Sequence, residues 1–377
     1  MNDRPALRLG IIGCGRATRE LHLPAIARVS GIEAVALADT NPTALAAAAD
    51  ASGAPARYTD HRGLLEDDAV EVVAVCVPAA AHEEVAVDAM RTGKHVLVEK
   101  PLALDLAACD RLVEAAADAP GRVLVGYNLR HHRLVRDLAE LLRAGGAGAI
   151  EAIRSTWTSA VRHSHDLPAW RDRRAEGGGA LFEIATHHVD LWRFLTGAEV
   201  ETVFAVGHGR ETDDETVALT ATLTNGVVVN ALFSERTAHE NTLVVYGREA
   251  RITLDPFRFD GLTVDAVGGK SGIAARLGRL AAFAEALPAG LASARIGGEF
   301  CLSYDHEWAH VRDVIAGDAA AAVTVEDGRR AVAVALAAMA SLESGRPVRV
   351  EDAPWTAPPP AYAAGHPAQS AGGVASH

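Results

Sequence analysis

The first 126 residues alternate between short apolar runs and alanine-rich stretches with a helical pattern. The apolar runs lie at 7–12, 33–38, 71–77, 95–99 and 122–127. The helical stretches between them lie at 17–29, 42–51, 82–92 and 105–117. Runs this short and this uniformly apolar are typical of strands that are covered on both faces. Strands that alternate with helices are joined by right-handed crossovers, so we predict a doubly wound α/β fold with an open parallel sheet.

After about residue 150 the pattern changes to successive strands with short turns. These strands are predicted at 150–159, 200–208, 216–224, 226–234, 241–247 and 250–255. The triplet Thr224-Asn225-Gly226 is a hairpin signal, and adjacent hairpins build an antiparallel sheet. Helices are predicted at about 180–195, 303–316 and 326–344. We therefore expect an α+β domain with a large, mostly antiparallel open sheet.

The two patterns predict one domain over residues 1–127 and a second domain over residues 128–352. Within the second domain, residues 267–300 are bounded by glycines and mostly helical in pattern, and we interpret them as an insertion. Residues 353–377 contain three successive prolines and many Gly, Ser and Ala residues, which predicts a disordered tail.

Charge and composition exclude several classes of function. The net charge is -13, which argues against nucleic acid or an anionic membrane as a partner. We find neither a long apolar run that indicates a membrane span nor a signal peptide, so we predict a cytoplasmic protein. The cysteines lie far apart without a CxxC pair, and the histidine pairs lie on different elements. We therefore expect no disulfide framework and no bound metal.

The turn after the first predicted strand has the residues that a dinucleotide needs. Gly13-Cys14-Gly15-Arg16-Ala17 lets the backbone approach a pyrophosphate, which then rests on the helix N-terminus. Asp39, followed by Thr40, ends the second strand, where a carboxylate binds the ribose hydroxyls of NAD and repels the 2′-phosphate of NADP. We predict NAD, with NADP as the alternative because Arg16 could meet a phosphate. Thr18 stands where a third glycine or alanine is usual.

Lysine is rare in this chain, and one of its three lysines follows a predicted strand directly. Lys100 lies between Glu99 and Pro101, whereas 33 of the 36 basic residues are arginine. The pKa of lysine moves readily on burial, so lysine supports proton chemistry that arginine does not. Ligands of open parallel sheets bind beyond the carboxyl ends of the strands. We therefore expect a cofactor crevice there, lined by Glu99, Lys100 and, after the neighbouring strand, Val77, Pro78 and His82.

A second polar group lies on the helix predicted at 180–195, which follows three glycines. Glu183 and His187 are four residues apart and share one helix face, and Asp190 lies near that face. A carboxylate beside a histidine can fix its tautomer and raise its basicity. The alternative is an ordinary capped helix with a solvated polar stripe.

Taken in order, these motifs resemble those of a known family. Over about residues 7–352 the chain resembles the glucose–fructose oxidoreductase / inositol dehydrogenase (Gfo/Idh/MocA) family, through GCGRAT, ADTNP, VCVPAAAH, GKHVLVEKPLAL, VGYNLR, GGGALFEIATHHVDL and SYDHEWAHVRDVIAG. The resemblance implies a Rossmann domain and a second domain whose open sheet often forms the oligomer interface. It also implies that Lys100 and His187 are catalytic and flank the reacting carbon. Glu183 would complete the set, although aspartate is usual at its position.

The resemblance implies an NAD-dependent dehydrogenase or ketoreductase for a sugar, cyclitol or sugar derivative, with His187 as acid/base beside Lys100. We expect substrate contacts from Arg130, His165, Trp170, Arg171 and Asp190, and a homodimer or homotetramer by analogy. One alternative is an enzyme that oxidises transiently and regenerates its NAD, ending in epimerisation, elimination or glycoside cleavage. A second alternative is a non-catalytic NAD-sensing protein, which would need only the nucleotide-binding half.

Overall fold

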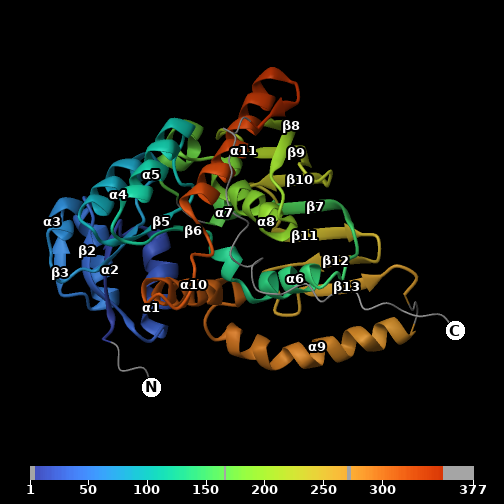
Figure 1. The fold of residues 1–377 in the computed structure, drawn as a ribbon, viewed down its shortest axis with the longest axis horizontal. Coiled ribbons are helices and arrows are strands. Elements are labelled where there is room, and N and C mark those ends of the chain that lie inside the picture. The colour runs from blue at the N-terminus through green and yellow to red at the C-terminus, as the bar shows by residue number, and fades with distance from the viewer. Residues whose placement is uncertain (1–4, 165–166, 270–272, 351–377) are drawn as a thin grey trace, which may run out of the picture.

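The N-terminal half of the molecule is a doubly wound parallel sheet, as predicted (Figure 1). The computed structural model describes residues 5–164, 167–269 and 273–350. The strand order is β3-β2-β1-β4-β5-β6, and every neighbouring pair is parallel. The strands are β1 (Leu7–Ile12), β2 (Ile32–Ala38), β3 (Ala56–Tyr58), β4 (Val72–Val75), β5 (His95–Glu99) and β6 (Val123–Gly126). The helical elements are η1 (Thr18–His22), α1 (Leu23–Arg28), α2 (Pro42–Ser52), α3 (His61–Leu65), η2 (Ala79–Ala81), α4 (His82–Arg91) and α5 (Leu106–Asp118).

Five of these strands were predicted, and the edge strand β3 was not. Its three residues alternate between half-buried and exposed side chains, so it has no continuous apolar run to reveal it. Side-chain caps explain why two helices begin where predicted. The Asn41 side chain accepts hydrogen bonds from two backbone N–H groups at the start of α2, and the Asp105 carboxylate accepts the Ala108 N–H at 2.8 Å at the start of α5.

The second half contains an eight-stranded sheet in the order β13-β12-β11-β7-β10-β9-β8-β14. Its strands are β7 (Ile150–Thr158), β8 (Val200–His208), β9 (Thr216–Leu223), β10 (Val228–Ser234), β11 (Glu240–Gly247), β12 (Ala250–Leu254), β13 (Leu262–Ala266) and β14 (Val348–Arg349). Only the β7–β10 pair is parallel among these described strands. The predicted hairpin is confirmed, because β9 and β10 pair antiparallel around Gly226, whose φ is 87°.

Helices cover one face of this sheet and tie it to the first domain. They are η3 (Asn128–His131), α6 (Arg133–Arg143), α7 (Val161–Ser164), η4 (Ala169–Asp172), η5 (Arg174–Glu176), η6 (Leu181–Ala185), α8 (Thr186–Thr196), α9 (Ile273–Ala294), α10 (Glu299–Ile315) and α11 (Val325–Ser344). α11 packs on β8 and α8 and also on α5 of the first domain. The predicted insertion contains the long helix α9, which lies along the lower side of the molecule in Figure 1 and contacts α10.

The helix α10 packs into the first domain although it comes from the end of the chain. Its side chains Tyr304, Trp308 and Val311 share one buried apolar cluster with Leu9 and Ile11 of β1. The helix therefore packs against the first strand of the parallel sheet. The predicted tail at 353–377 lies outside the described residues. Among the residues that are described, we find no helix both long and apolar enough to cross a membrane.

Candidate active site

The glycine turn after β1 has the shape that a dinucleotide requires. Gly13 has a φ of 97°, and a Cβ there would lie 2.4 Å from the carbonyl oxygen of Cys76, so only glycine fits. A Cβ on Gly15 would meet nothing within 4 Å, and Gly15, Arg16 and Ala17 are exposed at the start of the helix. The backbone at the start of this helix is therefore accessible, which fits a pyrophosphate.

Thr18 has a defined place in this turn although glycine or alanine is usual there. Its side chain is fully buried and its hydroxyl donates a 2.6 Å hydrogen bond to the Gly13 carbonyl oxygen. The helix passes through a π-helical turn, η1, at this point. Such π-helical turns are rare inside α-helices and are frequent at functional sites.

Asp39 stands at the end of β2 and is held by two backbone groups. Its Oδ2 accepts the Cys14 N–H at 2.7 Å and its Oδ1 accepts the Asn41 N–H at 2.7 Å. A carboxylate has about four lone-pair positions, so two remain for hydroxyl donors. Arg16 forms an ion pair with Glu20 at 3.0 Å on the exposed helix surface. Together with the glycine turn, the fixed Asp39 carboxylate fits the ribose and pyrophosphate of a dinucleotide.

The loops after β4 and β5 are joined by His82. Its two ring nitrogens lie 2.9 Å from the carbonyl oxygens of Val77 and Pro101. The imidazole is buried, and burial lowers its pKa. We predicted His82 as a cofactor contact; the structure places its buried ring between the two loops. Val77 and Pro78 remain at the crevice, half-buried and exposed respectively.

Lys100 extends from the end of β5 to the second domain. The Lys100–Pro101 peptide bond is cis. The Glu99 carboxylate accepts the Lys100 backbone N–H at 3.0 Å. The Lys100 Nζ donates a 2.9 Å hydrogen bond to the carbonyl oxygen of Glu183, 83 residues away in sequence. The ammonium therefore reaches the helical turn that precedes His187.

His187 is buried at the start of α8 in an aromatic environment. Its ring lies 5.3 Å from the Trp157 ring and 5.8 Å from the Tyr127 ring, measured between centroids. Its Nδ1 has no hydrogen-bond partner among the described residues. Burial, then the Lys100 ammonium and His188, lower the pKa of His187 well below its ordinary value of 6.5. Neither Tyr127 nor Trp157 was predicted as a site residue, although Tyr127 ends a predicted strand.

Glu183 does not orient His187 in the way that its spacing suggested. It lies in the π-helical turn η6, and its carboxylate forms an ion pair with Arg171. Arg171 also contacts the buried Glu235 at 3.3 Å, and Arg162 holds the other Glu235 oxygen at 2.9 Å. Burial and the neighbouring Glu183 raise the pKa of Glu235. Glu235 directly follows β10 and belongs to no recognisable sequence motif, so no sequence signal pointed to it.

Two predicted substrate contacts have a structural role instead. Arg130 and Asp190 form a buried bidentate pair, with N···O distances of 2.8 and 2.6 Å. Asp327 on α11 also pairs with Arg130, at 3.1 Å, and the neighbouring arginines lower its pKa to about 2. These groups are paired with each other between η3, α8 and α11, so their charges are not available to a ligand. Trp170 remains half-buried beside Arg171.

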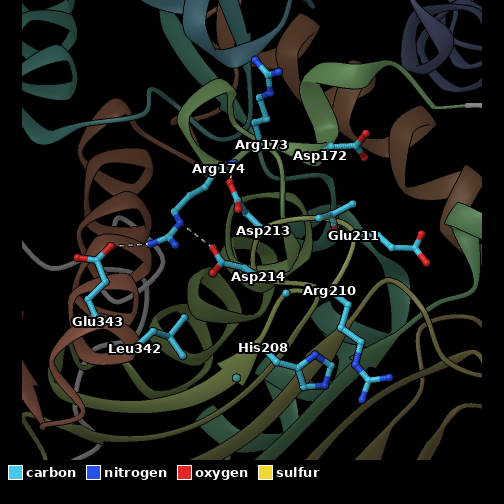
Figure 2. A pocket seen from close by; sticks show the side chains of 13 residues that line it. Asp172, Arg173, Arg174, His208, Arg210, Glu211, Asp213, Asp214, Leu342 and Glu343 are labelled. Atoms are coloured by element: carbon cyan, nitrogen blue, oxygen red, sulfur yellow. Dashed lines mark hydrogen bonds and ion pairs between the residues drawn. The ribbon is translucent and has the colours of Figure 1, made fainter.

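His165, another predicted contact, lies outside the described residues. A separate hollow of about 540 Å³ is lined by residues 172–174, 207–214, 342 and 343 (Figure 2). Figure 2 shows that Arg174 there pairs with Asp214 at 3.3 Å and with Glu343 at 3.0 Å. None of the predicted site residues lines this hollow.

Comparison with known proteins agrees with this arrangement. Residues 7–127 match the model of an oxidoreductase family with an NAD-binding Rossmann fold, and residues 135–253 match the Gfo/Idh/MocA C-terminal domain. A myo-inositol 2-dehydrogenase of Thermotoga maritima is 27% identical over 92% of this chain and 99% of its own length. A dTDP-3,4-didehydro-2,6-dideoxy-alpha-D-glucose 3-reductase of Streptomyces violaceoruber is 31% identical over 66% of this chain and 73% of its own length.

A solved structure shares the whole fold. The WlbA dehydrogenase from Bordetella pertussis, crystallised with NADH and UDP-GlcNAcA, superposes with a TM-score of 0.78 over 94% of this chain and 100% of its own, at 21% identity. The parallel sheet, the C-terminal sheet domain and the two family models all indicate the same family. It belongs to the Gfo/Idh/MocA family of oxidoreductases, with an NAD-binding Rossmann domain followed by the C-terminal domain of that family.

Proposed function

We propose that this protein transfers a hydride between a nicotinamide cofactor and a secondary alcohol or ketone of a sugar-like substrate. The observation that supports this most directly is the 2.9 Å hydrogen bond from Lys100 Nζ to the Glu183 carbonyl oxygen. It brings an ammonium of the Rossmann domain to the turn that precedes the imidazole of His187. Both groups then lie at the carboxyl ends of the parallel strands, where ligands of such sheets bind.

In this proposal His187 is the general base for alcohol oxidation. Its lowered pKa keeps the imidazole neutral near pH 7, so one ring nitrogen has a free lone pair. The substrate hydroxyl proton moves to that nitrogen as the hydride leaves the carbon. In the reverse direction the imidazolium returns the proton to the alkoxide. The aromatic rings of Tyr127 and Trp157 hold the imidazole in place.

Lys100 stabilises the negative charge that develops on the substrate oxygen. An ammonium has three donors, and the Glu183 carbonyl uses one of them. The other two can reach the alkoxide and the cofactor ribose, where a fixed positive charge in a partly dry site is effective. The bound nicotinamide supplies the chemistry of hydride acceptance and donation.

The Glu183 carboxylate is a candidate ligand for a second substrate hydroxyl. Arg171 occupies one of its oxygens, and further lone pairs remain free to accept a hydrogen bond. The cluster of Arg162, Arg171, Asp172, Glu183 and Glu235 carries two positive and three negative formal charges. It has no excess positive charge to attract an acidic group, which favours a substrate that presents hydroxyls here. Sugars, cyclitols and sugar nucleotides, the substrates in the relatives' names, all do so.

We further propose NAD as the cofactor, because the Asp39 carboxylate is fixed at the ribose position and would repel a 2′-phosphate. We also propose a homodimer or homotetramer. The uncovered face of the C-terminal sheet exposes large apolar side chains on two strands, namely Phe204, Val206, Val228 and Leu232. An apolar group of this kind on a sheet face favours burial against a second copy.

The test is NADH absorbance against a panel of sugars, inositols, aminosugars and sugar nucleotides, with each cofactor. We expect turnover on one class, and a roughly 100-fold or larger loss in Lys100→Met and in His187→Asn. Lys94→Met is the matched control, because Lys94 lies at the opposite end of β5 and donates to the carbonyls of Asp67 and Val70. Near-normal turnover in both site variants would refute the assignment. Product formation without net NADH would favour the cofactor-recycling alternative.

A further inference from the structure

Glu307, a buried glutamate on α10, has no role in the proposed hydride transfer. Glu307 is 1% exposed, and neither of its carboxylate oxygens has a hydrogen-bond partner among the described residues. An ionised carboxylate in this situation is strongly disfavoured, because burial removes water and nothing replaces it. The residue is therefore a candidate for a carboxyl group that keeps its proton.

The neighbours of Glu307 connect it to Lys100. On the same helix, Tyr304 packs edge-on against the His22 ring at 5.2 Å, and the Trp308 indole N–H donates to His22 Nδ1 at 3.2 Å. Because Nδ1 accepts, His22 is the neutral tautomer that donates from Nε2 to Glu99 Oε1 at 2.9 Å. The other Glu99 oxygen accepts the Lys100 backbone N–H.

Glu307 is buried and the Glu99 side chain is 13% exposed; the two carboxyl groups interact electrostatically and have different surroundings. Glu99 is hydrogen-bonded to His22 and to the Lys100 N–H, and near the Lys100 charge, so its pKa is lowered despite the opposing effect of burial. Burial and then the Glu99 charge raise the pKa of Glu307 from 4.5 to about 8. Environments that separate two pKa values in this way assign the charge to one group and the proton to the other.

We propose that Glu307 is a positioning residue that carries a proton in the resting enzyme, so that Glu99 is the single buried carboxylate behind Lys100. The role in catalysis rests on the proposed hydride transfer. The proton on Glu307 removes repulsion between the two carboxyl groups and leaves Glu99 free to hold the Lys100 peptide. Loss of that proton adds a second negative charge behind the ammonium, which weakens its stabilisation of the alkoxide.

The other titratable groups that face this cluster do not replace the proton of Glu307. Cys76 follows β4 and acts electrostatically on both His22 and Tyr304. Tyr304 is buried, and its pKa is raised well above 10, first by burial and then by Glu99 and Glu307. Tyr304 therefore stays neutral across the pH range in which Glu307 titrates.

The first test needs neither substrate nor cofactor. The infrared spectrum of the full-length protein at pH 7 should contain the carbonyl stretch of a protonated buried carboxylic acid, and Glu307→Gln should lose that band. The folded protein keeps a proton that the unfolded chain releases above pH 4.5, so Glu307 destabilises the fold increasingly as pH rises from 4.5 to about 8. The Tm of Glu307→Gln should therefore exceed that of wild type by a margin that grows across this window.

The second test is the pH profile of kcat/KM with the substrate found in the panel. Wild-type kcat/KM should fall severalfold as pH rises through about 8, the pKa of Glu307. Glu307→Gln should lose this inflection, because glutamine stays neutral, and a purely structural role would not move the profile. Glu299→Gln is the matched control. Glu299 is a buried glutamate on the same helix, but it is ion-paired with Arg133 at 3.2 Å.

The outcomes separate this inference from the proposed function. A protonated-carboxyl band that persists in Glu307→Gln, or a pH profile that superposes on that of wild type, would overturn the role of Glu307. Loss of the inflection in Glu299→Gln as well would also overturn it, since any buried glutamate of α10 would then have the same effect. If no substrate turns over but the infrared band is lost in Glu307→Gln, the proposed function is wrong and the protonation of Glu307 is still supported.

Discussion

Lys100 and His187 reach the same place by different physical means. Lys100 is delivered by a strand end, and the loop around it is held by backbone groups and by a histidine that contacts two backbone carbonyls. The glycine turn after β1 is likewise determined by backbone contact. In the second domain, the residues around His187 are held by ion pairs between side chains and by aromatic rings.

The difference has a consequence for how each half tolerates change. A parallel sheet places the ends of its strands at one edge whatever the side chains are, so the N-terminal part of the site is a property of topology. A buried ion-pair network depends on every partner, because removing one leaves an uncompensated charge. We therefore expect the C-terminal part of the site to be the more sensitive to single substitutions that affect stability.

The largest effect is expected from Asp190→Ala. It leaves the Arg130 guanidinium, 5% exposed, with part of its charge unpaired, so we expect a loss of about 3–5 kcal/mol in the free energy of unfolding. Urea unfolding monitored by tryptophan fluorescence measures this loss. Asp50→Ala is the control, because Asp50 is 77% exposed and its surface pair contributes at most about 1 kcal/mol. A change as small as the control's would remove the contrast between the two halves.

The next effect concerns activity. Arg171→Met removes the partner of Glu183 and one partner of Glu235, and leaves two carboxylates facing each other. Hydrogen bonds to charged groups contribute about 1.5–3 kcal/mol, so we expect kcat/KM to fall about tenfold to 100-fold. Arg173→Met is the matched control, since Arg173 is 73% exposed and pairs only with Glu176 among its described contacts. Equal losses in both variants would show that Glu183 does not depend on Arg171.

The same contrast explains what could be predicted from the sequence. The positions of Lys100, Asp39 and the glycine turn in the fold could be predicted because each follows the end of a predicted strand. Glu183 was assigned to His187 from a spacing of four residues, but the turn is π-helical and its carboxylate pairs with Arg171. The long-range partner of that pair, Glu235, follows no motif.

Burial was the other property that the sequence did not reveal. His82 and Arg130 have side chains that commonly bind ligands, and both were predicted to do so. The structure buries them, and each is satisfied within the protein, His82 by carbonyls and Arg130 by carboxylates. A polar residue after a strand therefore either binds a ligand or is satisfied within the protein. The loops after β4 and β5 decide this for His82, and α8 and α11 decide it for Arg130.

A smaller effect is expected in the N-terminal part of the site. Asp39→Ser removes the carboxylate that would repel a 2′-phosphate but keeps a hydrogen-bonding side chain. We expect the ratio of kcat/KM for NAD to that for NADP to fall about tenfold, which is about 1.4 kcal/mol. Asp50→Ser on α2 should leave this ratio unaltered, because its exposed carboxylate lies one helix away from the turn. An unchanged ratio in Asp39→Ser would mean that cofactor choice is set elsewhere.

The smallest effect compares the two halves directly through a matched pair of threonines. Thr18 and Thr186 are both fully buried, and each lies at one end of a π-helical turn. The Thr18 hydroxyl donates to the Gly13 carbonyl of the glycine turn at 2.6 Å, and the Thr186 hydroxyl donates to the Phe182 carbonyl of η6 at 2.9 Å. Alanine at either position loses one buried hydrogen bond, so each variant should lose about 1 kcal/mol in urea unfolding. If Thr18→Ala instead increases the free energy of unfolding, threonine strains the glycine turn. The N-terminal part of the site would then also depend on a single side chain and not on topology alone.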